Sequence, residues 1–188
     1  MAMPVVEMRV WTAEDVRALP ADPLRRFECV DGVLLVTPTP RRSHQQLVVE
    51  LAFALVEYVR RVHVGSVIVA PCGVELDLRT NVEPDVYVLP LIEGRLPRDT
   101  DSDVTPLLVI EVLSPSTARN DRLVKRPRYQ RAGIECWIVD SESRLVERWT
   151  PDAERPEILA DVVTWLPVGA AEPFNLLLPK FFSDVLGD

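Results

Sequence analysis

Hydrophobic residues recur along the chain with two different periods, which predict a mixture of helices and strands. Between residues 43 and 62, leucine and valine return every three or four positions, which is the spacing of one buried face of an α-helix. Shorter apolar runs predict strands, among them residues 107–113. A single charged residue, Glu111, stands inside this run. Its presence in a strand that should be buried raises the question of what its carboxylate contacts.

The remaining pattern predicts two hairpins, further strands and three more helices. Asp31-Gly32 is a strong turn signal between two apolar runs, and it predicts a hairpin at 26–38. We also expect helices at 12–20, at 119–132 and from Pro179, strands near 66–70, 73–78, 85–89 and 157–161, and a hairpin at 135–150. Mixed elements of this kind predict an α/β fold in which helices cover a central sheet.

The composition indicates a globular protein. With 188 residues, 47% of them hydrophobic, the chain is long enough for a single domain over residues 1–188. No run approaches the roughly 18 apolar residues of a membrane span, and no signal peptide is evident, so we expect a cytoplasmic protein. The formal net charge of −8 argues against a protein that coats nucleic acid without specificity. It permits an enzyme with an acidic metal site and a local basic face.

Asp85 is a candidate partner for Glu111. Asp85 begins the strand expected at 85–89, whereas Glu111 lies near the end of its own strand. If the two strands are antiparallel neighbours, the two acids face the same spot, with Leu89 opposite Leu107. Two close carboxylates repel each other, and Mg²⁺ bound by both would remove that repulsion. The alternatives are that Glu111 lies at a solvated strand end or pairs with an arginine.

The segment 119–132 concentrates positive charge in an acidic protein. Its basic residues are Arg119, Arg122, Lys125, Arg126, Arg128 and Arg131, against a single acid, Asp121. Lys125 follows Glu111 by one loop and about one helical turn, so it could reach the same site and act on a phosphate. The alternative is an ordinary surface pair of Lys125 with Asp121, whose loss would cost only about 0.2–0.5 kcal/mol. Pro127 should start or kink the helix near Lys125.

At these residues the sequence resembles the Uma-two family of restriction endonucleases, in the PD-(D/E)XK nuclease superfamily. The resemblance rests on PDVYV at 84–88 and on the pattern VLSPST…DR…K…Y…AG…WIVD at 112–140, and it covers nearly the whole chain. It implies a restriction-endonuclease-like core, in which helices flank a mixed central β-sheet and acids lie at adjacent strand ends. It also implies an endonuclease that hydrolyses DNA with the help of Mg²⁺ or Mn²⁺.

The resemblance assigns roles to individual residues. Asp85 matches the aspartate of the PD motif, and Glu111 matches the acid that follows it. The usual lysine two residues later is replaced by Leu113, which implies that Lys125 takes over its role. Glu28 matches another recurrent acid and is a candidate outer metal ligand, unless it is only a half-exposed strand residue.

The mechanism implied by the resemblance is hydrolysis of a phosphodiester. Asp85 and Glu111, with the backbone carbonyl of Val112 as a further ligand, would hold the metal, which activates a water. Lys125 would orient that water or stabilise the transition state. The residues expected to hold the DNA backbone are Arg41, Arg42, Arg119, Arg122, Arg126 and Arg128. A homodimer is expected because two sites can cleave both strands of a duplex.

A different class of function stays open. The acidic net charge and the lack of an appended DNA-reading domain favour a nuclease-fold nucleic-acid-binding or regulatory module without independent catalysis. Two further interpretations concern single residues. His44 opens the helix at 43–62, where a surface or capping role is favoured over a role in the site. The tryptophans at 137, 149 and 165 are expected in the core.

Overall fold

A computed structural model describes residues 9–101 and 104–187. Its helical segments are α1 (Ala13–Arg17), α2 (Arg42–Val62), α3 (Ala118–Asn120), the π-helical turn η1 (Asp121–Lys125), α4 (Arg126–Arg131) and α5 (Leu178–Leu186). None of the helices in these ranges is long and apolar enough to cross a membrane. The sequence that bears on a signal peptide lies partly outside the described residues.

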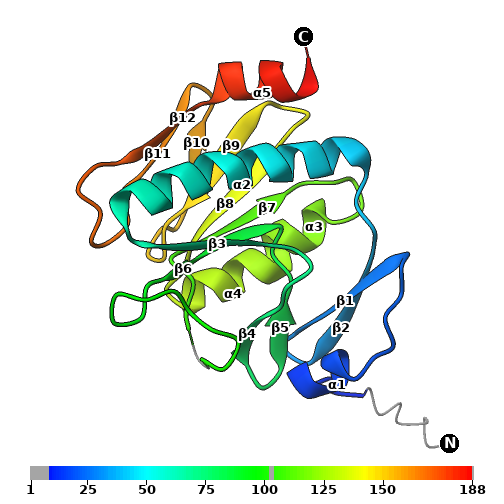
Figure 1. The fold of residues 1–188 in the computed structure, drawn as a ribbon. Helices are drawn as coiled ribbons and strands as arrows, with labels where there is room; N and C mark the ends of the chain where they lie inside the picture. The colour runs from blue at the N-terminus through cyan, green and yellow to red at the C-terminus, as the bar shows by residue number, and fades with distance from the viewer. Residues whose placement is uncertain (1–8, 102–103, 188) are drawn as a thin grey trace, which may run out of the picture.

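The strands form three sheets (Figure 1). They are β1 (Arg25–Val30), β2 (Val33–Pro38), β3 (Gly65–Val69), β4 (Val74–Asp77), β5 (Thr80–Val82), β6 (Val86–Pro90), β7 (Leu108–Val112), β8 (Glu135–Asp140), β9 (Leu145–Trp149), β10 (Glu157–Leu159), β11 (Val162–Trp165) and β12 (Phe174–Leu177). The largest sheet has six strands in the order β10-β9-β8-β7-β6-β3. A four-stranded sheet has the order β2-β1-β5-β4, and β11 pairs with β12.

The six-stranded sheet is mixed. Strands β7 and β8 are parallel, and the helical segment α3–η1–α4 connects them, as a parallel pair requires a crossover. Strands β6 and β7 are antiparallel neighbours, with Val88 opposite Leu108 and Val86 opposite Ile110. The register expected from the sequence, which places the end of β7 beside the start of β6, is therefore correct.

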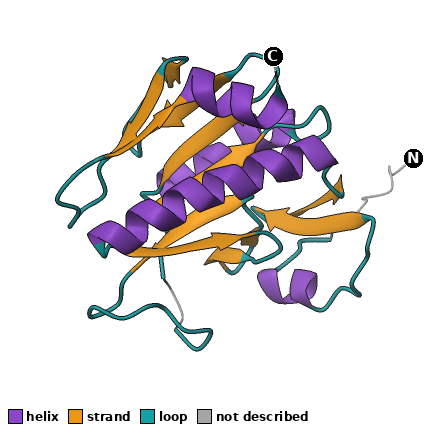
Figure 2. Ribbon diagram, turned by 45° about the horizontal axis from the view of Figure 1, so that its top comes forward, coloured by secondary structure: helices purple, strands orange, loops and turns teal. Residues whose placement is uncertain are grey.

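Helices cover the sheet on both faces. On one face α2 and α5 lie side by side (Figures 1 and 2), and the buried face of α2 includes Leu47, Leu51 and Leu55. Full burial of each such side chain stabilises the fold by about 1.5–3 kcal/mol. On the other face, residues of β7 and β8 pack with Tyr129 of α4. The predicted α/β fold with a mixed sheet and flanking helices is confirmed.

Side chains on β7 alternate between these two faces. Leu108, Ile110 and Val112 belong to the core under α2, whereas Val109 belongs to the core under α4. Because successive strand residues point to opposite faces, Glu111 points toward the helical segment that follows β7. The strand therefore delivers one carboxylate to the side on which Lys125 and Tyr129 lie.

The helix expected at 119–132 forms, but its middle is a π-helical turn. The amide N–H of Arg126 donates to the carbonyl of Asp121, five residues back. Pro127 follows immediately and has no N–H to donate, so the regular helical pattern is interrupted here. The expected irregularity near Lys125 is confirmed. Asp121 and Lys125, the first and last residues of this turn, are both buried.

Two parts of the fold differ from the expected elements. The sequence predicted a strand at 157–161, but β10 ends at Leu159, and the following residues form the β11–β12 hairpin that was not expected. The indoles of Trp137 and Trp165 are buried as predicted. Trp149 is only half-buried, and the guanidinium of Arg126 stacks on its ring, 4.0 Å from the ring centroid.

Candidate active site

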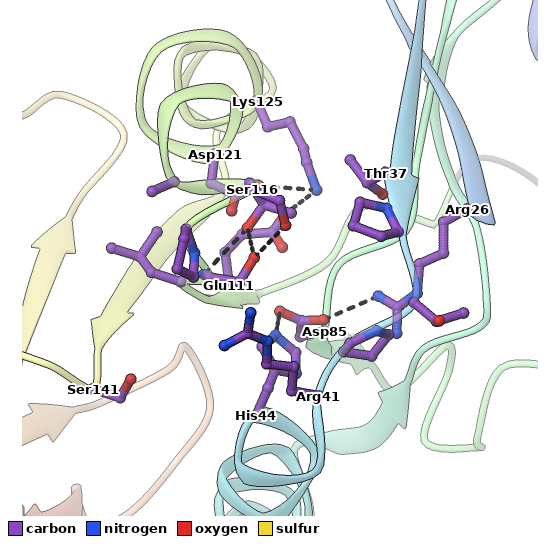
Figure 3. A pocket seen from close by; sticks show the side chains of 18 of the residues that line it. Arg26, Thr37, Arg41, His44, Asp85, Glu111, Ser116, Asp121, Lys125 and Ser141 are labelled. Atoms are coloured by element: carbon purple, nitrogen blue, oxygen red, sulfur yellow. Dashed lines mark hydrogen bonds and ion pairs between the residues drawn. The ribbon is translucent and has the colours of Figure 1, made fainter. Parts of the chain in front are cut away.

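A cavity of about 620 Å³ lies where the N-terminal end of α2, strand β1 and the turn η1 approach the end of β7. Figure 3 shows the side chains of Asp85, Glu111, Asp121 and Lys125 around it, with His44 entering from α2. The structure thus brings together acids that are far apart in the sequence.

Asp85, immediately before β6, has three polar partners. The N–H of Val112 donates to its Oδ2 at 2.9 Å, His44 Nε2 lies 3.1 Å from the same oxygen, and Arg26 donates to Oδ1 at 3.2 Å. Burial alone would raise the pKa of Asp85, but the contact with His44 and the Val112 N–H outweigh burial and lower it. These contacts therefore favour the ionised form of Asp85.

Glu111 is buried, at 2% exposure, and it is held through one oxygen. The hydroxyl of Tyr129 donates to Oε1 at 2.6 Å, and Lys125 Nζ lies 2.9 Å from the same atom. Burial raises the pKa of Glu111 well above its usual value, despite the nearby charge of Lys125. The alternatives of a solvated strand end and of an arginine partner are both wrong, because the partners are a lysine and a tyrosine.

Lys125 lies among three carboxylates. Its Nζ is 3.0 Å from Glu28 Oε1, 2.9 Å from Glu111 Oε1 and 3.3 Å from Asp121 Oδ1, and its side chain is 5% exposed. Burial alone would lower the pKa of Lys125, but the carboxylates raise it well above its usual value. Lys125 is a buried cation, and the interpretation of Lys125 and Asp121 as a surface pair is wrong.

Glu28 joins the site from strand β1. It is 3% exposed, so the interpretation as a half-exposed strand residue is wrong. Its Oε1 accepts the N–H of Glu83 at 2.8 Å as well as the contact with Lys125. This carboxylate therefore fixes the position of Lys125 in the resting structure.

Residues 13–176 match the model of the Uma2 family, described as "Putative restriction endonuclease". The chain belongs to this family. A solved structure described as "a putative nuclease belonging to DUF820 from Anabaena variabilis ATCC 29413" is similar to it, with 21% sequence identity and a TM-score of 0.69. The similarity covers 92% of this chain and 98% of that one, and it shows a shared fold. No curated protein matches the chain.

Carboxylates outnumber cations in the cavity of this Uma2 protein. Its four buried acids are Glu28, Asp85, Glu111 and Asp121, while Arg26 and Lys125 carry the fixed positive charges next to them. The pKa of Asp121 is raised by its burial, as is that of Glu111. Glu111 and Asp121 therefore ionise less readily on their own, and a further cation bound beside them would favour their ionised forms.

The donors for such a cation are not all side chains. Within residues 9–101 and 104–187, no three His, Cys, Asp or Glu side chains lie together as a metal-binding group. The carbonyl oxygen of Val112 supplies another donor, and it lies 2.9 Å from His44 Nε2. Two carboxylates, one carbonyl and water would suit Mg²⁺, which commonly retains several waters.

The arginines expected to bind nucleic acid fall into two groups. Arg41, Arg42 and Arg119 are exposed, and Arg41 lines the cavity. The others are partly buried and pair with groups of the protein: Arg122 with Glu147 and Asp140, Arg126 with Gln130 and Trp149, and Arg128 with Asp31, Asp77 and Thr80. Arg122 also lines the cavity.

Three residues of the site were not assigned to it from the sequence. The favoured surface or capping role of His44 is wrong, because its side chain is 10% exposed and contacts Asp85. Arg26 lies two residues before Glu28 on β1, so both lie on one face of that strand. Tyr129 follows Lys125 by four residues, which places both on one helix face. These spacings were the available signals.

Proposed function

We propose that this protein is a metal-dependent endonuclease that hydrolyses phosphodiester bonds in DNA, with Asp85, Glu111 and Lys125 as its catalytic residues. The observation that carries the proposal is a cavity lined by Asp85 and Glu111, in which Glu111 contacts the buried Lys125. The family's description as a restriction endonuclease supports the same reaction class.

The donor set fits a divalent metal. Asp85, Glu111 and the Val112 carbonyl would hold Mg²⁺ or Mn²⁺, with Glu28 as an outer ligand. When bound, the metal would lower the pKa of a water and neutralise charge on the phosphodiester. Both described contacts of Glu111 are made by Oε1, so Oε2 is the oxygen available to a ligand. Asp85 differs, because Arg26 donates to its Oδ1 and the N–H of Val112 donates to its Oδ2.

Lys125 contributes a positive charge that is fixed in place before substrate arrives. Three carboxylates orient its ammonium group at the inner wall of the cavity. An ammonium group held in this way stabilises negative charge that develops on a phosphate without first having to reorganise. Lys125 reaches Glu111 from a helix, and a lysine at position 113 is therefore unnecessary.

The mouth of the cavity offers positive charge to a nucleic-acid backbone. Arg41 lines the cavity, and Arg42 and Arg119 are also exposed. Arginines at such positions bind phosphates without reading sequence. We further propose that the protein acts as a homodimer, since two sites related by a two-fold axis can cleave both strands. Light scattering at micromolar concentration, with and without DNA, tests this assembly.

The experiment that tests the activity compares substrates and metals directly. Purified protein is incubated with plasmid, single-stranded DNA and RNA, in Mg²⁺, in Mn²⁺ or in EDTA. Cleavage of DNA that needs a metal, and that is lost in Asp85→Asn, supports the proposal. Asp184→Asn is the matched control, because Asp184 is an exposed acid on α5. Cleavage that persists in Asp85→Asn contradicts it.

A module without independent catalysis is the second candidate. The observation that favours it is the contact of Lys125 with three carboxylates, which leaves its ammonium group fully engaged. In that case the protein would bind nucleic acid, and neither metal would support cleavage of any of the three substrates.

A further inference from the structure

His44 occupies the first turn of α2 and points into the cavity beside Asp85 (Figure 3). Its side chain is nine-tenths buried. The Nε2 atom lies 3.1 Å from Asp85 Oδ2 and 2.9 Å from the carbonyl oxygen of Val112. One imidazole nitrogen and two oxygens, from three separate parts of the chain, therefore converge.

Both oxygens that face His44 Nε2 are acceptors. A single N–H at Nε2 is shared between them, so neither receives an undivided hydrogen bond. If Nε2 carries no proton, three lone pairs face one another. That arrangement is unfavourable unless a cation lies among them, and it is then a set of ligands.

In this second arrangement the other ring nitrogen, Nδ1, would carry the proton. Nδ1 is buried and has no hydrogen-bond partner in the described structure. Moving the proton from Nε2 to Nδ1 gives up the Nε2–H contacts and leaves a buried Nδ1–H without an acceptor, so this tautomer is favoured only when a cation binds Nε2. A metal bound there would meet a bare Nε2, which is the form in which histidine binds metals.

We propose that His44 Nε2 is a protein ligand of the metal, together with Asp85 Oδ2 and the Val112 carbonyl, and that it makes the site prefer Mn²⁺ to Mg²⁺. This inference rests on the proposed function, which requires a metal in this cavity. An imidazole ligand suits first-row transition ions, whereas Mg²⁺ takes oxygen ligands. His44 thus determines the metal preference of the site without adding negative charge.

The chain offers a direct spectroscopic test because it has two histidines, His44 and His63. His63 is exposed at the opposite end of α2, about 28 Å away for 19 residues of helix. It has a positive φ of 54°, which asparagine tolerates, so His63→Asn leaves His44 as the one histidine.

Pulsed electron paramagnetic resonance of bound Mn²⁺ in His63→Asn should show coupling to an imidazole nitrogen. Selective ¹⁵N-histidine labelling should change that coupling. Bound Mn²⁺ with no histidine coupling overturns the inference, and this result does not depend on any substitution inside the cavity.

Calorimetry supplies an independent measurement. In His44→Gln the Kd for Mn²⁺ should rise at least about tenfold, since even outer-shell substitutions weaken metal sites by about 10–100-fold. The Kd for Mg²⁺ should change much less, and thermal melting of the metal-free variant shows whether it folds. Equal weakening for both ions contradicts the preference. The proposed metal-dependent function fails instead if the wild type binds neither ion. It also fails if the wild type and Asp85→Asn bind each ion with the same affinity.

Discussion

Lys125 Nζ lies 3.0 Å from Glu28 Oε1, and this contact between two buried side chains links the turn η1 to strand β1. In the sequence, the strands from β2 to β7 and the helix α2 lie between these two residues. Lys125 also contacts Glu111 and Asp121, so one ammonium group lies against three buried acidic side chains. Its removal would leave buried negative charges without a partner.

We therefore predict that Lys125→Ala lowers the free energy of unfolding by about 3–5 kcal/mol, as expected when one partner of a buried ion pair is removed. Chemical denaturation measures this change. The matched control is Lys180→Ala, which removes an exposed i,i+4 pair with Asp184 and should cost at most about 0.5 kcal/mol. Equal losses in the two variants would show that Lys125 is not buried as described. The earlier expectation from a surface pair, that stability is almost unchanged, is replaced by this one.

A second prediction concerns Glu111 and pH. Its pKa in the folded protein lies well above the ordinary value of 4.5, so the folded state keeps a proton that the unfolded chain has lost. The free energy of unfolding should therefore fall as pH rises from about 4.5 through the folded-state pKa. Glutamine cannot ionise, so Glu111→Gln should not show this fall in the free energy of unfolding. The variant should therefore have a higher Tm than the metal-free wild type at neutral pH, with little difference below about pH 4.5.

Thermal melting across this pH range measures the difference, with EDTA present throughout. Glu172→Gln is the control, because Glu172 is an exposed acid that pairs with Arg61. An equal gain in both variants, or a Glu111→Gln variant that is less stable at neutral pH, would contradict the raised pKa of Glu111.

The sequence predicted how the two acids are brought together, because strand pairing follows from local patterns. An apolar run with one carboxylate predicted β7, and a second run that starts at Asp85 predicted β6. The antiparallel register then placed Leu89 beside Leu107, in agreement with the observed pairing of Val88 with Leu108. These relations depend only on alternation along strands and on which strands are neighbours.

What the sequence did not predict depends on contacts between distant elements. The charge pattern of 119–132 left open whether Lys125 reaches Glu111 or lies on the surface, and only the packing of the helix against β1 and β7 makes it a buried cation. Likewise, a histidine in the first turn of a helix has no local signal for burial. His44 becomes part of the site because α2 begins beside the ends of β6 and β7.

A third prediction tests whether Tyr129 positions Glu111. Tyr129→Phe keeps the buried ring but removes the hydroxyl that donates to Glu111 Oε1 at 2.6 Å. A carboxylate held by one partner fewer should bind metal about 10–100-fold more weakly, as for other outer-shell changes. Calorimetry with Mn²⁺ measures the affinity. Tyr58→Phe is the control, since its hydroxyl donates to the Glu172 carbonyl and its ring packs near Trp165. A similar loss in both variants would point to a general effect on stability.

The last prediction separates arginines that bind nucleic acid from arginines that hold the fold. Arg41 is exposed at the cavity and should contact phosphate, whereas Arg122 bonds to Glu147 and Asp140 on β9 and β8. Arg41→Ala should weaken DNA binding similarly for all sequences and reduce the dependence of log K on log salt by about one. Its Tm should not change.

Arg122→Ala should lower the Tm, because it leaves two carboxylates without their partner, and should change the salt dependence less. Fluorescence anisotropy at several salt concentrations, with melting curves for each variant, measures both quantities. The prediction is wrong if Arg122→Ala is stable but loses salt dependence, while Arg41→Ala binds DNA as wild type does. That outcome would assign the phosphate contacts to the helical segment that carries Lys125.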